Sequence, residues 1–250
     1  MEALLETRGL CRQFGGFRAV DTVSLSVAPG TIHSVIGPNG AGKTTFFRLL
    51  TGGLAPSGGR VRFAGEDITG LAPHSVTRKG LAQSFQITNV FARLTVLESV
   101  VMAIVARRRR SADFFSYFHR SAPVRREALE IIAQIGLGAL AGRQAGTLSH
   151  GDQRALEVAL ALATRPRLLM LDEPTAGMSP WETERMTATV QALARERGLT
   201  VLFSEHDMDV VFAISERVTV MHQGRIIAEG PPQQVRANAE VTAVYLGSEA

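Results

Sequence analysis

A glycine-rich segment near the N-terminus has the residue types and spacing of a phosphate-binding loop. Residues 37–44 read Gly-Pro-Asn-Gly-Ala-Gly-Lys-Thr, which fits the pattern G-x-x-x-x-G-K-[ST]. Glycines let a backbone wrap closely, with N–H groups pointing inward where they can bind phosphate oxygens. Lys43 is placed to contact the β- and γ-phosphates of a nucleotide, and the Thr44 hydroxyl is a Mg²⁺ ligand. The alternative is a glycine-rich turn that fits the pattern by chance.

A pair of carboxylates follows an apolar run further along the chain. Residues 168–173 read Leu-Leu-Met-Leu-Asp-Glu. In open α/β sheets, ligands bind at the carboxyl ends of the strands. Asp172 is therefore placed to hold Mg²⁺ through water, and Glu173 to accept a proton from an attacking water. Many strands end in acids before a turn, so this interpretation depends on the phosphate-binding loop.

The elements around these residues alternate between strand and helix. The run 31–36 predicts a strand before the loop, and 43–51 a helix after it. From residue 149 onward the pattern predicts helices at 151–164, 182–197 and 208–214, and strands at 167–171, 200–204, 218–221 and 225–228. Continuous apolar strands separated by helices indicate an α/β fold with a parallel sheet covered on both faces.

The middle of the chain has a different pattern. Residues 96–109 and 123–136 are helical in periodicity, with Leu129, Ile132 and Ile135 on one face of the second helix. A polar, aromatic-rich connector at 111–122 separates them, and no strand is convincing here. We interpret this region as a helical insertion.

Composition excludes several classes of protein. The chain has 250 residues, 45% hydrophobic and 20% charged, which is typical of a globular protein. The single cysteine allows no internal disulfide and no cysteine metal cluster, which favours a reducing, cytosolic setting. The N-terminus lacks a secretory signal, and no apolar run reaches the roughly 18 to 20 residues of a membrane span.

The basic charge is confined to one part of the chain. The net charge is +4 and the pI is about 9.9, which alone would suggest nucleic acid or an anionic membrane. Between Arg60 and Glu130, 12 basic residues face 6 acidic ones, and the rest of the chain has a slight acidic excess. The run 107–110, four arginines, fits a solvated helix end, with contact to anionic lipid or to nucleic acid as alternatives.

Three further motifs resemble those of ABC-transporter ATPases. Residues 148–154, Leu-Ser-His-Gly-Asp-Gln-Arg, resemble the signature motif, Gln86 matches the Q-loop glutamine, and His206 matches the switch histidine. The resemblance covers essentially all 250 residues. It implies a P-loop NTPase of the ABC-ATPase type, with a RecA-like parallel-sheet core, an N-terminal antiparallel β subdomain and an inserted α-helical subdomain. Residues 1–250 would form one ABC ATPase domain, with 1–85 and 143–250 as the core and 86–142 as the insertion.

The resemblance also implies roles for individual residues. Two such domains sandwich two ATP molecules head to tail, so Ser149 and Gly151 would contact the γ-phosphate bound by the opposite chain. Phe14 would stack on adenine, unless it is a core aromatic, and His206 would sense the γ-phosphate, unless it is only a hydrogen-bonded strand-end histidine. The expected catalytic residues are Glu173, His206 and Gln86, and the expected Mg²⁺ ligands are Thr44, Gln86 and Asp172. The expected ATP-binding residues are Phe14, Gly37, Pro38, Asn39, Gly40, Ala41, Gly42, Lys43, Thr44, Thr45, Ser149 and Gly151.

Three positions depart from the family pattern. His150 and Asp152 replace a glycine and a glutamine of the signature motif, and Ser179 replaces the D-loop aspartate. A carboxylate near a bound phosphate weakens binding by charge repulsion, so we expect Asp152 to face outward. The cross-dimer role of the D-loop aspartate is open in this chain. The other five histidines lack a comparable context, and we expect surface or capping positions for them.

Several segments resemble the ATPase subunits of branched-chain amino acid importers and of their relatives for urea and short amides. These segments are 14–20, 174–180, 205–211, 227–230 and 245–247. The resemblance implies a subunit on the cytoplasmic face of the plasma membrane that energises import of branched-chain amino acids or related small polar solutes. Its partners would be a second ATPase subunit, identical or paralogous, two membrane permease subunits and, indirectly, a solute-binding protein, with no nucleic acid.

Alternative functions come from the same superfamily. Lipopolysaccharide-export ATPases share the Ala-Gly-Met-Ser segment at 176–179, and soluble ABC ATPases of DNA repair or translation are another possibility. A non-hydrolysing adaptor conflicts with the intact Glu173 and His206. In this family a groove beside the Q-loop receives a short helix of the membrane subunit, so residues 85–97, with Phe91, Leu94 and Val96, are the expected receiving surface. The alternative is that these apolar residues only fill the helical core.

Overall fold

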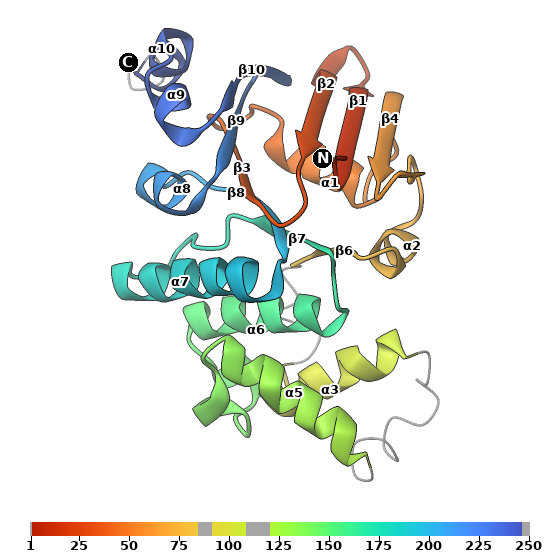
Figure 1. Cartoon of the computed structure of the whole chain (residues 1–250), viewed down its shortest axis with the longest axis vertical. Helices are drawn as coiled ribbons and strands as arrows, with labels where there is room; N and C mark the ends of the chain where they lie inside the picture. Colours follow the sequence, from red (N-terminus) through yellow and green to blue (C-terminus); the bar gives the residue numbers. More distant parts are fainter. Residues whose placement is uncertain (1, 85–91, 109–120, 247–250) are drawn as a thin grey trace.

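The core of the molecule is a six-stranded sheet, seen in a computed structural model that describes residues 2–84, 92–108 and 121–246 (Figure 1). The strand order is β10-β9-β3-β8-β7-β6. Neighbouring strands run parallel, except that β10 is antiparallel to β9. The strands are β3 (Ile32–Ile36), β6 (Leu81–Gln83), β7 (Leu168–Asp172), β8 (Thr200–Ser204), β9 (Arg217–His222) and β10 (Arg225–Gly230).

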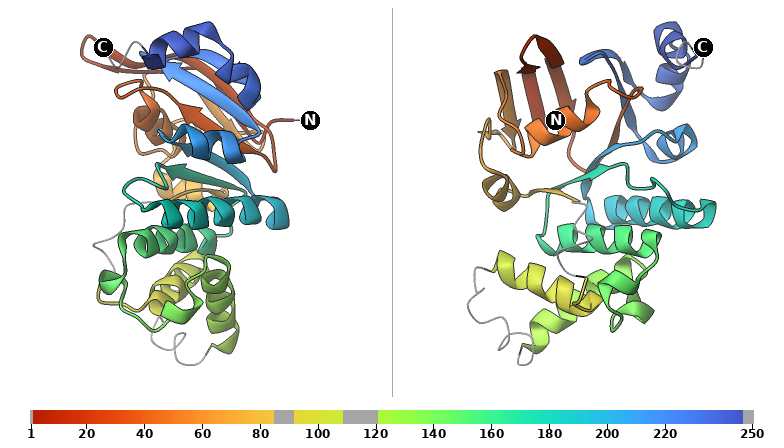
Figure 2. Two further views of the ribbon diagram at one scale, coloured as in Figure 1. Left: turned by 90° about the vertical axis from the view of Figure 1, so that its left-hand side faces the viewer. Right: turned by 180° about the vertical axis from the view of Figure 1, so that it is seen from behind.

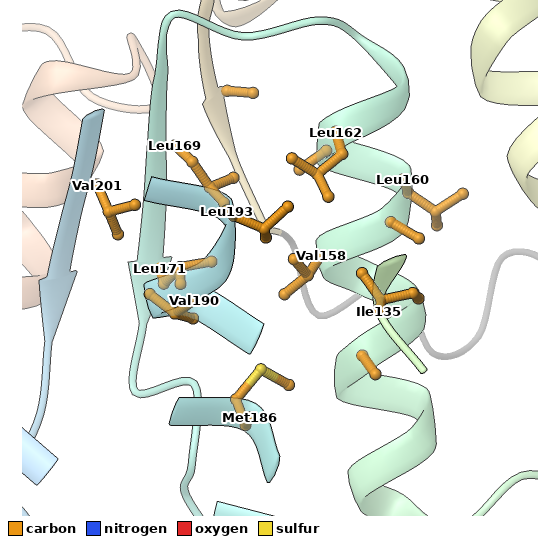
Figure 3. Packing of buried hydrophobic residues seen from close by; sticks show 14 of the residues in the cluster. Ile135, Val158, Leu160, Leu162, Leu169, Leu171, Met186, Val190, Leu193 and Val201 are labelled. Carbon is orange, nitrogen blue, oxygen red and sulfur yellow. The ribbon is translucent and has the colours of Figure 1, made fainter. Parts of the chain in front are cut away.

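Both faces of this sheet are buried, because successive side chains of a strand point to opposite sides. Leu169 and Leu171 of β7 belong to a cluster with α6 (His150–Ala163) and α7 (Pro180–Arg197). Figure 3 shows the side chains that meet them there: Val158, Leu162, Val190 and Leu193. Leu168 and Met170 belong to a second cluster on the opposite face. The prediction of a parallel sheet covered on both sides is confirmed.

The second cluster lies between the large sheet and a smaller antiparallel one. The smaller sheet has the order β2-β1-β4-β5, with strands β1 (Leu5–Phe14), β2 (Phe17–Val27), β4 (Gly58–Phe63) and β5 (Glu66–Asp67). Helix α1 (Lys43–Leu50) contributes Phe46 and Phe47 to the shared core, both completely enclosed. Asp21 of β2 pairs with Arg225 of β10, which ties the two sheets together. Helix α2 (Pro73–Arg78) leads into β6.

Helices α3 (Val96–Arg107) and α5 (Ala122–Gln134) lie at the end of the molecule away from the antiparallel sheet (Figures 1 and 2). Thr95 begins α3 with a capping box, in which its side chain and that of Glu98 each bond the other's backbone N–H. Two 3₁₀ turns, η2 (Gly138–Leu140) and η3 (Ala145–Thr147), connect α5 to α6. The expected insertion is therefore helical in its described parts, while its boundaries at 86 and 142 stay a prediction.

The buried face of α5 differs from the predicted one. Leu129 is 41% exposed, whereas Ile132 and Ile135 are buried together with Val124 and Ala128. The helix packs against both α3 and α6, and the positions that face them recur at three- and four-residue spacing from Val124. Leu129 lies outside that stripe, so its placement on the core face was wrong.

The last part of the chain adds three short helices. These are α8 (Met208–Ile214), α9 (Pro232–Arg236) and α10 (Ala239–Leu246), and the last two were not predicted. His33 of β3 is completely buried and bonds the Thr219 hydroxyl, so its expected surface or capping position was wrong. Within the described residues, no helix combines the length and apolar character needed to cross a bilayer.

Candidate nucleotide-binding and hydrolysis site

The phosphate-binding loop lies where β3 ends and α1 begins. Gly37 follows the last residue of β3, and Lys43 is the first residue of α1. A Cβ atom at Gly37, whose φ is +152°, would lie 2.1 Å from the carbonyl oxygen of Met221. A Cβ atom at Gly42 would lie 2.3 Å from the carbonyl oxygen of Ala19. The loop is thus threaded between two other backbone segments, and only glycine fits at these two positions.

Lys43 points back into the concave side of this loop. Its side chain is almost completely buried, and Nζ donates hydrogen bonds to the carbonyl oxygens of Gly37 at 2.6 Å and Pro38 at 3.2 Å. Burial lowers the pKa of Lys43, and the nearby charges of Glu173 and Asp172 oppose that shift. Among the described residues, no side chain caps the N-terminus of α1, so no side-chain acceptor there occupies its first N–H groups. This arrangement fits a phosphate group.

The two carboxylates at the end of β7 are held by the neighbouring strand β8. The Ser204 hydroxyl donates to Oδ1 of Asp172 at 2.5 Å. The Glu173 N–H donates to the backbone oxygen and to Oγ of Ser204, both at 3.1 Å. Glu173 has a φ of +50°, a left-handed conformation that costs a non-glycine residue about 1 kcal/mol. These contacts hold the side chain of Asp172 and the backbone of Glu173 in place, and Ser204 was not predicted as a site residue.

His206 completes this cluster from the segment after β8. Its Nε2 donates to Oε1 of Glu173 at 2.7 Å. The buried carboxylate of Glu205 fixes the segment, because it accepts from the Thr175 N–H at 3.0 Å and from the His206 N–H at 3.0 Å. Glu205 was also missed from the sequence, although its place between a buried strand and His206 was a usable signal. The structure therefore brings Lys43, Asp172, Glu173 and His206 to one edge of the sheet.

The oxygen groups present suit Mg²⁺. Thr44 is exposed at the start of α1, next to Lys43, and Asp172 is the last residue of β7 at the same edge of the sheet. Mg²⁺ is commonly held by one or two carboxylates together with substrate phosphates, rather than by an all-protein cage. The described residues contain no group of three or more His, Cys, Asp and Glu able to hold a metal. Gln86, the third expected ligand, lies outside the described residues.

The signature residues lie at the N-terminus of α6. Ser149 caps this helix by accepting from the Asp152 N–H at 3.1 Å, and its hydroxyl donates to Oε1 of Glu182 at 3.3 Å. Asp152 forms an ion pair with Arg185 of α7 and is largely covered. Asp152 thus points to a cation on α7 of its own chain, and its expected orientation away from a bound phosphate stays a prediction. Ser179 caps α7.

Phe14 ends β1 at the tip of the hairpin with β2. Its ring is 44% exposed, so it is not a core aromatic. The Arg12 guanidinium lies 4.5 Å from the ring centroid, which supports the ring from one side. An exposed, supported aromatic ring is suited to stacking on a planar base, and that role stays a prediction.

Comparison with known proteins identifies the family. Residues 20–176 match the family model described as "ABC transporter". The chain belongs to the ABC transporter family of ATP-binding proteins. Residues 225–250 match a further model, "Branched-chain amino acid ATP-binding cassette transporter". This chain is therefore an ABC-type ATP hydrolase.

Full-length relatives and solved structures agree with this assignment. This chain is 43% identical to the high-affinity branched-chain amino acid transport ATP-binding protein BraF of Pseudomonas aeruginosa, with 98% of each chain covered. It is 40% identical to the corresponding protein LivG of Escherichia coli K12, again over 98% of each chain. A crystal structure of a nucleotide-free ATP-binding cassette from an ABC transporter matches with a TM-score of 0.85 and 32% identity, covering 98% of this chain and 99% of that one. The predicted ABC-ATPase fold is confirmed.

Proposed function

We propose that this chain is the ATP-hydrolysing subunit of an importer for branched-chain amino acids. The observation that carries the proposal is the full-length similarity to BraF and LivG, together with the C-terminal match at 225–250. That match lies beyond the residues of the nucleotide site and includes β10, α9 and α10, so it distinguishes this group from ABC ATPases in general. The subunit would work at the cytoplasmic face of the membrane, bound to two permease subunits.

The geometry supports specific roles in hydrolysis. The phosphate loop, with Lys43 and the N-terminus of α1, binds and orients the phosphates of ATP. Thr44, Asp172 and Gln86 would hold Mg²⁺, which when bound neutralises charge on the phosphates. Glu173 accepts a proton from the attacking water, and His206 orients its carboxylate through the 2.7 Å hydrogen bond. Phe14 stacks on the adenine ring.

A second ATPase subunit would complete the site. Ser149 and Gly151 lie at a helix N-terminus, where N–H groups and the helix dipole favour an anion. The hydroxyl of Ser149 bonds to Asp152 of α6 and to Glu182 of α7 in its own chain, and its hydrogen-bond partners in the described part of the chain include no residue of the phosphate loop. This separation supports a head-to-tail dimer, in which each signature motif reaches the γ-phosphate held by the other chain.

A groove next to the core suggests where a permease subunit docks. It has a volume of about 580 Å³ and lies between α2, β6, α3 and α6, with Met102, Ala103, Ala106 and Leu160 among its apolar lining. Of the predicted receiving surface at 85–97, Val96 and Leu97 are buried in the core and Phe91 lies outside the described residues. Val96 therefore fills the helical core and is not part of a receiving surface. We propose that the groove between α2, β6, α3 and α6 receives the permease helix.

Two of the four arginines at 107–110 form ion pairs within the chain. Arg107 and Arg108 both pair with Glu127 of α5, and Arg107 also donates to the backbone oxygen of Ala163. Arg109 and Arg110 lie outside the described residues. The pairing favours a structural role for the first two arginines over binding of lipid or nucleic acid.

A mixing experiment tests the composite site. Chains carrying Lys43→Ala should be inactive, and so should chains carrying Ser149→Arg. When the two are mixed, one site of each mixed dimer has Lys43 from one chain and Ser149 from the other, so activity should return, up to one site per dimer. A mixture that stays inactive, while each variant still pairs with an unmodified chain, would show that both residues act within one chain.

A measurement of solute-stimulated ATP hydrolysis tests which solute is transported. The ATPase would be purified from membranes with its associated chains and reconstituted with the solute-binding protein that is found with them. We expect leucine, isoleucine and valine to stimulate ATP hydrolysis, with no stimulation by urea or short amides. Stimulation by urea alone, or co-purification with a lipid-exporting membrane subunit, would overturn the assigned solute.

A further inference from the structure

The carboxylate of Glu182 joins the starts of two helices. Oε2 accepts hydrogen bonds from the Ser179 N–H at 3.0 Å and from the Ser179 hydroxyl at 2.8 Å, within the capping box of α7. Oε1 accepts from the Ser149 hydroxyl at 3.3 Å, at the start of α6. A single side chain thus bonds to the capping residues of both helices.

The neighbouring glycine of the signature motif is part of the same contact. Gly151 lies directly against the carboxylate, since a Cβ atom at position 151 would lie 2.4 Å from Oε1 of Glu182. The hydrogen bonds from Ser179, followed by those from Ser149 and Gly151, lower the pKa of Glu182, so the side chain stays ionised near neutral pH.

One helical turn further, Arg185 makes a second connection between the same helices. It forms an ion pair with Asp152 and lies 4.9 Å from the ring centroid of Trp181. Ser179 and Asp152 both depart from the family pattern. Each contacts a residue on the first turns of α7: Ser179 bonds to Glu182, and Asp152 pairs with Arg185. Glu182 supplies a carboxylate three residues after the position where the family pattern has its D-loop aspartate.

We propose that Glu182 is a positioning residue that couples the signature residues Ser149 and Gly151 to the segment following Glu173. The inference rests on the proposed head-to-tail site. A serine hydroxyl has one hydrogen to donate, and in the chain by itself Glu182 accepts it, which holds the hydroxyl and the start of α6 in place. The hydroxyl then turns from Glu182 to the phosphate when the partner's ATP arrives. Because Glu182 also caps α7 through Ser179, a movement of either helix start is transmitted to the other. The signature therefore reaches a partner's phosphate in an orientation that Glu182 sets.

The variants Glu182→Ala and Glu182→Gln test this coupling, with Glu184→Ala as the matched control. Glu184 is exposed on the same helix, and no described contact involves its carboxylate. The first measurement is amide hydrogen exchange at residues 149–153. We expect faster exchange in Glu182→Ala, partial rescue in Glu182→Gln, whose amide can still bond both serines, and no change in Glu184→Ala. Unchanged exchange in Glu182→Ala overturns the coupling.

The second measurement is ATP-driven association in a Glu173→Gln background, followed by sedimentation. We expect Glu182→Ala to weaken association about tenfold, since hydrogen bonds to a charged group are lost. ATP affinity measured at low protein concentration should be unchanged, because Glu182 touches none of the phosphate-loop residues. A loss of thermal stability with unchanged association would assign Glu182 to capping alone and overturn the proposal.

The two proposals fail in different ways. If the chain that carries only Glu173→Gln does not dimerise when ATP is added, either with itself or with its co-purified ATPase partner, the head-to-tail site is wrong. If that chain associates and Glu182→Ala associates equally well, the shared site stands and the positioning role of Glu182 is wrong.

Discussion

The imidazole of His206 lies 2.7 Å from the carboxylate of Glu173, with Nε2 facing Oε1. The two residues follow neighbouring parallel strands, β8 and β7, and Ser204 and Glu205 hold their backbones in register. A carboxylate that accepts a hydrogen bond from a histidine, beside a buried lysine, supports our proposal that Glu173 activates water next to a phosphate.

Replacing Glu173 by glutamine should separate binding from hydrolysis. We expect Glu173→Gln to keep ATP affinity and to lower turnover by roughly 10² to 10⁴, the usual range for loss of a general base. Steady-state ATPase assays and a nucleotide titration measure the two effects. Adding His206→Ala to Glu173→Gln should lower turnover little further, because His206 acts through the carboxylate. Normal turnover in Glu173→Gln would exclude Glu173 as the base.

Lys43 should matter for nucleotide binding and little for folding. Lys43→Ala should weaken ATP binding by about 10- to 100-fold or more, since a charge-assisted contact to phosphate is lost. Its burial already disfavours the charged form, so we expect no loss in the free energy of unfolding. Lys79→Ala is the control, because Lys79 is the only other lysine and pairs with Glu66 on the surface. Unchanged ATP affinity in Lys43→Ala would refute the phosphate-loop assignment.

Two glycines of the loop should respond very differently to alanine. At Gly37 a Cβ atom would lie 2.1 Å from the Met221 carbonyl oxygen, whereas at Gly40 it would have no atom of the described part of the chain within 4 Å. Gly37→Ala should therefore lower the free energy of unfolding by roughly 2–4 kcal/mol, through clash and backbone strain. Gly40→Ala meets only the strain of its φ of +78°, about 1 kcal/mol. Denaturant unfolding compares them, and equal losses would contradict the threaded loop.

His33 should make the protein less stable at acid pH. Burial, aided by the charge of Arg217, lowers its pKa to about 4, from 6.5 when exposed. Between these values the unfolded chain binds a proton that the folded chain excludes, so the free energy of unfolding falls as pH falls from 6.5 toward 4. Over this pH range the free energy of unfolding loses about 3 kcal/mol through His33.

Urea unfolding of His33→Gln against the unmodified chain at pH 7 and pH 4.5 isolates this effect. Glutamine does not titrate, so the drop in stability between the two pH values should shrink in the variant. An equal drop in both proteins would assign the acid sensitivity to other groups.

The sequence by itself determined the phosphate loop, the acidic pair, the family and the alternation of strands with helices. These features are local: a loop between one strand and one helix, or two residues at a strand end, is encoded within a few positions, and periodicity follows from residues three or four apart. Strand 200–204 and helix 208–214 were predicted at their observed bounds for this reason.

The tertiary structure alone decided which of these residues meet. Ser204 contacts Asp172 because β8 lies between β3 and β7 in the sheet. No single segment of the sequence determines this strand order. The burial of His33 follows from its central strand, and the exposure of Leu129 from the face of α5 that packs against α3 and α6. Glu182 reaches Ser149, 33 positions earlier, only because α6 and α7 pack side by side. Long-range packing sets such contacts, so local residue patterns could not predict them.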